Sequence, residues 1–122
     1  MGYHHIAVED IETTPDRPCT RRSVSEAAGL ENLGANVYDA EPGEQIPLAY
    51  HTHDEQEEVF YVSSGTLHVE TPDETFEVGA EEVFVVEPDS PQRAFVPESA
   101  DESVRAFVVG APAVDDAHAY ED

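Results

Sequence analysis

The sequence predicts an all-β domain. From residue 33 onward, short runs rich in Val, Phe, Tyr and Thr alternate with breaks that contain Pro, Gly or Asp, a pattern typical of strands joined by turns. No segment of about 10 to 15 residues keeps the helical spacing of apolar side chains, so alternating strands and helices are not expected. A chain of 122 residues suits one domain with one core. Short strands at this spacing indicate a sandwich or a small barrel.

The chain divides into three parts by composition. Residues 1–32 are expected to form an N-terminal strand and arm, residues 33–111 the barrel, and residues 112–122 an acidic C-terminal tail. Because the tail is short and rich in carboxylates, we expect it to be mobile or lightly docked.

Three elements are expected before the barrel. Residues 3–8 are predicted to form a strand. Residues 12–22 are predicted to form a loop or arm, because they contain two prolines and three of the five arginines. A single helical turn follows, with Ser25 as its N-cap and Gly29 as its stop.

Eight strands are expected in the barrel, each bounded by turn residues such as the Pro-Gly pair at 42–43 or the Pro-Asp pair at 72–73. They fall at residues 34–40, 46–52, 57–63, 66–71, 74–78, 83–87, 92–96 and 103–109.

The candidate site lies in residues 51–65, HTHDEQEEVFYVSSG. His51 and His53 are two positions apart, so in a strand their side chains point to the same side. If the polar interval after them is a turn, Glu58 lies on the returning strand, where Cβ atoms of paired residues are about 4.5–5.5 Å apart. Two imidazoles and one carboxylate at that range can form a metal site of the two-histidine, one-carboxylate kind.

The same residues carry a family resemblance. Gly43, His51-x-His53, Glu58 and Gly65 resemble the first cupin motif, and the stretch 79–92, from a glycine through VFVV to EPDSPQ, resembles the second. The resemblance implies a double-stranded β-helix, or jelly-roll barrel, with a metal ion inside. His51, His53 and Glu58 would be its ligands.

The second motif departs from the family pattern. Gln92 stands where the family has a histidine, and Asp89 stands where a turn glycine is usual. Gln92 can bind the metal through its oxygen, which is a weaker ligand than imidazole, or hydrogen-bond a metal-bound water, or leave the site too weak to stay filled. Zinc, manganese, iron and nickel all suit the ligand set, so the identity of the divalent ion is open.

The charge is extreme, with 28 acidic residues, five arginines, no lysine and a net charge of −23. Such a surface repels phosphate, which disfavours nucleic acids and anionic membranes as partners. The composition resembles that of cytosolic proteins from salt-in halophiles, and we expect a protein adapted to concentrated salt. The carboxylates next to Glu58, namely Asp54, Glu55 and Glu57, are assigned to this surface.

The sequence is compatible with both a catalytic and a non-catalytic function. One possibility is a metal-dependent protein acting on a small molecule, such as an oxygenase, isomerase or decarboxylase, and another is a non-catalytic ligand-binding or scaffold cupin with an empty or weakened site. The resemblance also implies a homodimer, and the absence of a signal-peptide pattern indicates a cytoplasmic location. Cys19 is expected to be structural or incidental. The remaining histidines, His4, His5, His68 and His118, are not expected in the site.

Overall fold

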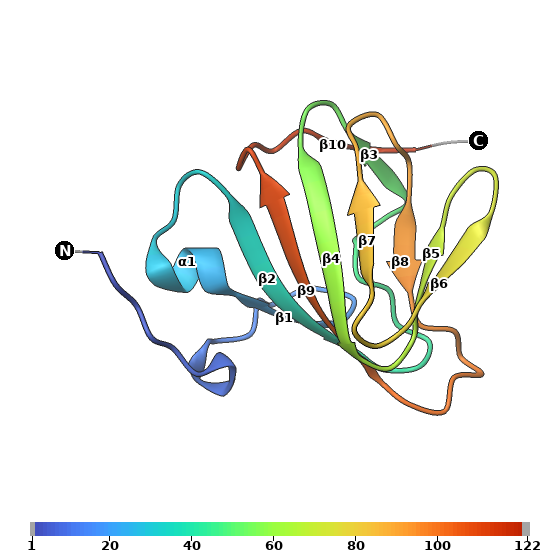
Figure 1. The fold of residues 1–122 in the computed structure, drawn as a ribbon, viewed down its shortest axis with the longest axis horizontal. Coiled ribbons are helices and arrows are strands. Elements are labelled where there is room, and N and C mark those ends of the chain that lie inside the picture. Colours follow the sequence, from blue (N-terminus) through green and yellow to red (C-terminus); the bar gives the residue numbers. More distant parts are fainter. Residues whose placement is uncertain (1, 121–122) are drawn as a thin grey trace.

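A computed structural model describes residues 2–120 of the chain. Its main layer is an antiparallel sheet of five strands, which fans across the centre of Figure 1. In spatial order these strands are β1 (Thr20–Ser23), β2 (Gly34–Ala40), β9 (Val104–Ala111), β4 (Glu57–Ser64) and β7 (Val83–Val86).

A second antiparallel sheet faces the first. It contains three strands in the order β6 (Thr75–Val78), β5 (Leu67–Glu70) and β8 (Arg93–Phe95). A two-stranded pair of β3 (His51–His53) and β10 (Ala117–Ala119) closes one end of the molecule, at the top of Figure 1. The nearly all-β, antiparallel arrangement confirms the predicted fold class and is that of a jelly-roll barrel.

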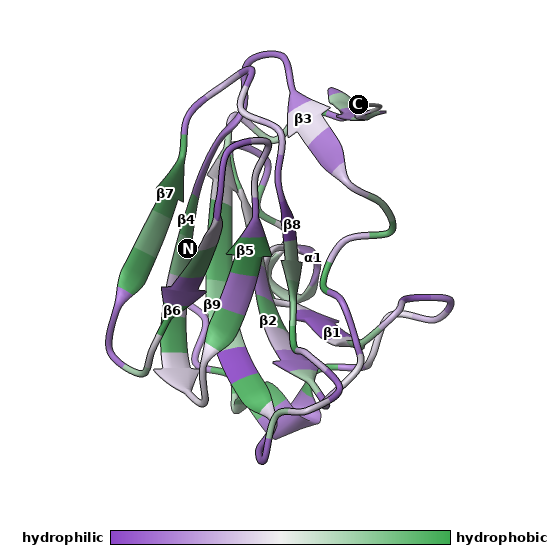
Figure 2. Ribbon diagram, turned by 90° about the vertical axis from the view of Figure 1, so that its right-hand side faces the viewer, coloured by the Kyte–Doolittle hydropathy of each residue, from purple (hydrophilic) through white to green (hydrophobic). Residues whose placement is uncertain are grey.

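The hydrophobic core lies between the two sheets. Burial alternates along β9, where Val104, Ala106 and Val108 are buried and the residues between them face outward. Leu67 and Val69 of β5 meet them from the opposite sheet and are fully buried. Figure 2 shows the apolar residues distributed over strands of both sheets. This alternation is the period-two pattern expected for strands with one face in a core.

The first part of the chain differs from the prediction. Residues 3–7 form no strand, and a short 3-10 helix, η1 (Val8–Asp10), follows them. No strand edge pairs with residues 3–8, and Tyr3 is 86% exposed, so the backbone there has no ladder to join. The edge strand of this region is instead β1, which pairs with β2.

The helical turn was predicted correctly, but with the wrong N-cap. Helix α1 (Val24–Ala28) begins after Ser23, whose hydroxyl accepts a hydrogen bond from the amide of Glu26. Ser25 lies inside the helix and accepts a hydrogen bond from the amide of Ala35 on β2. Gly29 ends the helix with a left-handed backbone, as expected. No helix within residues 2–120 has the length and apolar character that crossing a membrane requires.

The strand predicted over residues 46–52 is much shorter in the structure. Only His51–His53 belongs to a strand, and the preceding residues form bends, with Ile46 donating one backbone hydrogen bond to Ala94. Pro47 has no N–H to donate and therefore interrupts a continuous ladder.

The acidic tail is docked through strand β10. Its residues Ala117 and Ala119 pair with His53 and His51 of β3, and the amide of Tyr120 donates to the carbonyl of Tyr50. The last described part of the chain therefore runs beside the predicted metal-binding strand.

Candidate metal centre

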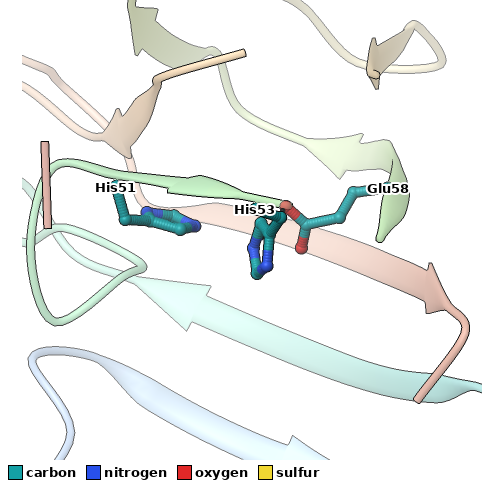
Figure 3. Close-up of side chains that lie close together, drawn as sticks. All are labelled: His51, His53 and Glu58. Carbon is teal, nitrogen blue, oxygen red and sulfur yellow. Dashed lines mark ion pairs between the residues drawn. The ribbon is translucent and has the colours of Figure 1, made fainter. Parts of the chain in front are cut away.

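Strand β3 presents both candidate histidines to one side. The ring centroids of His51 and His53 are 4.9 Å apart with their planes at 85°, and both imidazoles are drawn together in Figure 3. Backbone hydrogen bonds hold the strand on two sides, from β10 and from an isolated bridge between His51 and Gln92. The histidines are thus fixed on a paired segment rather than on a free loop.

Glu58 reaches the histidines from β4, in the other layer of the barrel. One of its carboxylate oxygens lies 3.4 Å from Nε2 of His53, and Figure 3 shows the carboxylate pointing toward that ring. The expected ladder between the histidine strand and the Glu58 strand is absent, because β3 pairs with β10 whereas β4 pairs with β7 and β9. The three side chains meet because all of them point into the barrel.

The distances suit one bound ion. One potential ligand atom from each of His51, His53 and Glu58 lies within 4.8 Å of the other two. Two atoms that each lie about 2.1 Å from one ion are at most about 4.2 Å apart. Three atoms spaced evenly around one ion at this distance are mutually at most about 3.6 Å apart, so the side chains would have to rotate to bring their ligand atoms about 1 Å closer together.

Gln92 lies beside this group. It exchanges backbone hydrogen bonds with His51, and its side-chain amide donates to Glu58 over 3.4 Å. The residue is only 2% exposed, and its Oε1 is buried without a hydrogen-bond partner among residues 2–120. Buried polar atoms are rarely left unsatisfied. The donor set therefore fits a divalent ion or an ion-bound water at this oxygen.

The ring nitrogens are differentiated by their hydrogen bonds. Nδ1 of His51 donates to the carbonyl of Ala49 over 3.1 Å, and Nδ1 of His53 donates to Oδ1 of Asp116 over 2.8 Å. Each Nε2 is therefore the nitrogen available to a metal ion.

The two imidazoles differ in basicity. Burial lowers the pKa of His51, although the charge of Glu58 opposes this effect. The hydrogen bond to Glu58 raises the pKa of His53 to about 9, with help from Asp116 and against the effect of burial. Without a metal ion, His53 is thus a cation held between two carboxylates at neutral pH. A divalent ion bound at Nε2 would replace one proton as the source of positive charge.

Asp116 is a member of the site that sequence reasoning missed. Burial by itself raises the pKa of Asp116, but hydrogen bonds from the amides of Glu55 and Gln56 and from His53 lower it to about 2. No motif signals this residue, because it lies 63 positions after His53 in a segment that reads only as acidic.

Arg17 is a second residue that the sequence did not single out. It extends from the N-terminal arm, is half-buried, and donates from Nη2 to the carbonyl of Ile46 over 3.0 Å. Its guanidinium carbon lies 6.0 Å from the ring centroid of Tyr38, and its charge contributes to the lowered pKa of His51. The arm therefore reaches the barrel interior near the site.

The other predicted assignments agree with the structure. Asp54, Glu55 and Glu57 are exposed, whereas Glu58 is half-buried and lies within the group that could hold a metal ion. The four remaining histidines lie outside the metal group: His4 and His5 are exposed, His68 packs on Phe95, and His118 pairs with Asp54.

Residues 36–110 match the Cupin domain family. The chain is a cupin. The match begins within β2 and ends within β9, and it contains His51, His53, Glu58 and Gln92 but not Asp116. Comparison with curated proteins finds no sequence relative.

Solved structures of similar fold cover nearly the whole chain. A cupin-superfamily sugar phosphate isomerase from Silicibacter pomeroyi is 21% identical over 98% of this chain and 83% of its own, with a TM-score of 0.81. The polyketide cyclase RemF from Streptomyces resistomycificus is 19% identical over 98% and 87%, with a TM-score of 0.81. Streptomyces PAC13 with uridine is 17% identical over 99% and 93%, with a TM-score of 0.73. At these identities the likeness is one of fold.

Proposed function

We propose that this cupin binds one divalent metal ion inside its barrel, with His51, His53 and Glu58 as ligands and Gln92 at or beside the fourth position. The observation that carries the proposal is the convergence of three ligand atoms within 4.8 Å. The buried, unpartnered Oε1 of Gln92 beside them supports it. Zinc, manganese, iron and nickel remain the candidate ions, since imidazole and carboxylate ligands suit each of them.

The partner of the metal would be a small molecule. Three side-chain ligands leave coordination positions for water or a substrate, and a bound divalent ion can polarise an oxygen on that substrate. The similar folds include a sugar phosphate isomerase, a polyketide cyclase and a protein with uridine, all of which involve small organic molecules. The net charge of −23 opposes nucleic acid as a partner.

A second candidate function is non-catalytic binding of a small ligand, with a weakened metal site. Gln92 favours it, because an amide oxygen binds these ions less strongly than the imidazole that the family pattern has at this position. Whether or not the protein is catalytic, we expect it to form a homodimer. The barrel could then serve as a dimer scaffold and bind a small ligand at the same time.

Metal content tests the leading proposal. Protein purified in concentrated salt should carry close to one equivalent of a divalent ion by elemental analysis, and His51→Ala should reduce metal affinity by at least about tenfold, or about 1.4 kcal/mol. His68→Ala is the matched control, because His68 lies on β5 with its ring against Phe95. Wild-type protein that neither retains nor takes up stoichiometric metal would refute the proposal.

Substitution of Gln92 tests whether its side chain binds the metal ion directly or lies beside the coordination sphere. If its oxygen occupies a ligand position, Gln92→His should tighten metal binding by about tenfold, since imidazole is the better ligand. If Gln92→His binds metal with the same affinity as wild type, Gln92 lies outside the coordination sphere. The argument that Gln92 weakens the metal site, which favours the non-catalytic function, would then no longer hold.

A further inference from the structure

The segment after the Cupin domain match is built into the candidate site. The match ends at residue 110, yet the following residues return to the histidine strand and pair with it as β10. The carbonyl of Pro112 accepts a hydrogen bond from the side chain of Gln56, and His118 pairs with Asp54 over 2.7 Å. The tail therefore contacts both β3 and the turn that leads to Glu58.

Asp116 is the centre of these contacts. Its Oδ1 accepts from Nδ1 of His53 over 2.8 Å, and its Oδ2 accepts from the amides of Glu55 and Gln56 over 2.7 and 3.0 Å. Three donors thus share the two oxygens of one carboxylate. Such an arrangement suits an ionised carboxylate, which has two acceptor oxygens and no proton to donate.

The hydrogen bond to His53 determines which ring nitrogen can bind metal. While Nδ1–H is held by Asp116, the lone pair of a neutral ring is on Nε2, the nitrogen that faces Glu58. Carboxylates that hold a metal-bound histidine in this way set its tautomer, its orientation and its basicity.

The amide hydrogen bonds connect the same carboxylate to the second ligand. Glu55 and Gln56 form the turn between β3 and β4, and Glu58 follows only two residues later. Since β3 and β4 share no ladder, Asp116 is a direct polar connection between the histidine strand and this turn. Its loss would loosen the distance between the His53 and Glu58 ligand atoms.

We propose that Asp116 is a positioning residue for the metal centre, through which the C-terminal segment fixes the tautomer of His53 and the turn before Glu58. The inference rests on the proposed metal-binding function. It adds that the residues matched by the Cupin domain family do not make the complete site of this chain.

Asp116→Asn is the sharpest variant, because the side chain keeps its shape but has only one acceptor oxygen. If that oxygen serves the amides of Glu55 and Gln56, the amide NH₂ faces Nδ1 of His53 and favours the tautomer with its proton on Nε2. Metal affinity should then fall by about 10- to 100-fold, the range typical for such outer partners. Asp116→Glu keeps two acceptor oxygens and should bind metal more tightly than Asp116→Asn.

Asp115→Asn is the matched control, since Asp115 is the exposed neighbour and carries the same charge. Affinity is measured by competition for Zn²⁺ with a chromophoric chelator. In parallel, the metal-free proteins are compared by NMR. The ring ¹⁵N shifts of His53 are recorded at about pH 10, above its pKa of about 9, where the ring is mostly neutral and has a defined tautomer. The hydrogen exchange of the Glu55 and Gln56 amides is followed at neutral pH. These signals report the fold and the tautomer without any metal, and in Asp116→Asn they should shift whereas in Asp115→Asn they should not.

The outcomes are distinguishable. Wild-type protein that binds no Zn²⁺ contradicts the proposed function itself. Tight binding by wild type with equal affinity in Asp116→Asn overturns the role of Asp116 alone. An equal loss in Asp115→Asn and Asp116→Asn would also overturn it, because the effect would then be one of general charge. A selective loss in Asp116→Asn together with a changed His53 tautomer supports it.

Discussion

Gln92 combines deep burial with an incomplete set of hydrogen bonds. Its amide nitrogen has Glu58 as an acceptor at 3.4 Å, but its oxygen has no partner within the described residues. Leaving a buried acceptor unsatisfied costs about 1–3 kcal/mol. An ion or an ordered water at this oxygen would remove that cost, so the energetics of one side chain favour an occupied site.

Cys19 is a residue whose chemistry is suppressed by its surroundings. It is a member of the buried core, and burial raises the pKa of its thiol from 9.0 to about 11, with the Arg17 charge acting in the opposite direction. Only the thiolate is nucleophilic. The structure thus agrees with the expectation that this cysteine is structural.

We predict that Cys19 is nearly inert toward thiol reagents in the folded protein. At pH 8 about 0.1% of a thiol with a pKa of about 11 is ionised, against about 9% at the unperturbed value of 9.0. Labelling by an aromatic disulfide at pH 8 should therefore be at least about 100-fold slower in the native protein than in denaturant. Stability should also fall between pH 9 and pH 11, because the unfolded chain ionises there first. Equal labelling rates would contradict the burial of this thiol.

The three residues of the family motif that converge in the structure could be predicted from the sequence, whereas Asp116 could not. His51, His53 and Glu58 follow one another within eight positions, and their spacing alone separates Glu58 from three neighbouring carboxylates. Asp116 acts through a contact across 63 positions. One aspartate among many acidic residues carries no local signal, so only the pairing of β10 with β3 identifies it.

Elements were predictable where the apolar residues alternate. Strands β2, β4 and β9 lie within two residues of their predicted bounds because their side chains alternate between core and surface. Strands β1 and β10 have no such pattern, and they exist because a neighbouring edge offers backbone partners. Local sequence does not determine that kind of strand.

The turn between β4 and β5 depends on Gly65. Its φ is +79°, and a Cβ atom there would lie 2.4 Å from the backbone oxygen of Ser103. Gly29, at the end of α1, has a similar φ of +69° but open space around it. Replacing Gly29 by alanine would add only backbone strain, whereas the same change at Gly65 would add both backbone strain and steric overlap.

We predict that Gly65→Ala destabilises the protein by about 2–4 kcal/mol, from left-handed strain plus a clash that shifts the backbone. Gly29→Ala should cost only about 1–2 kcal/mol, since strain acts alone. Urea unfolding of both variants measures the difference. Equal losses would mean that the segment at Ser103 yields freely to the added methyl group.

Taken as a whole, the molecule has few positive charges with which to balance its carboxylates. Arg22 and Arg105 both pair with Asp39, and Arg93 pairs with Glu70. Most of the 28 acidic residues are therefore uncompensated by arginine. Mutual repulsion among them opposes the compact state, and it weakens as the Debye length falls to about 3 Å near 1 M salt.

We predict that the protein is adapted to concentrated salt. Raising KCl from a low to a multimolar concentration should increase the free energy of unfolding by about 2 kcal/mol, which corresponds to a rise in Tm of about 8 °C for a domain of this size. Thermal unfolding followed by circular dichroism measures the change. Equal melting temperatures would contradict the prediction.

The outer face of the five-stranded sheet carries an apolar patch at its β7 edge. Val83 and Val85 are 59% and 60% exposed, and they pair across the ladder with Tyr61 and Val59, which are also exposed. Phe107 of β9, 37% exposed, continues the patch beside Tyr61. Strand β7 appears as a strongly apolar ribbon in Figure 2. Patches of this kind are typical of surfaces that contact another protein.

We predict that this patch is buried in a homodimer. Light scattering in concentrated salt, where repulsion between two acidic chains is screened, should give twice the chain mass, and Val85→Glu should shift the protein toward monomer. Leu48→Glu is the control, because Leu48 is 68% exposed but lies in the loop before β3. A wild-type monomer in concentrated salt would contradict the prediction.

The position of β9 has a consequence for the order in which this molecule can be made. β9 lies between β2 and β4, and its residues come after those of every other strand in the two main sheets. Ribosomes deliver the chain from its N-terminus, at about 5–20 residues per second. The two halves of the larger sheet therefore remain unjoined until residue 111 has been synthesised, and β3 has no partner strand until β10 follows. A metal ion bound by His51, His53 and Glu58 would therefore enter a site whose histidine strand is held by β10 only after residue 119 has been synthesised.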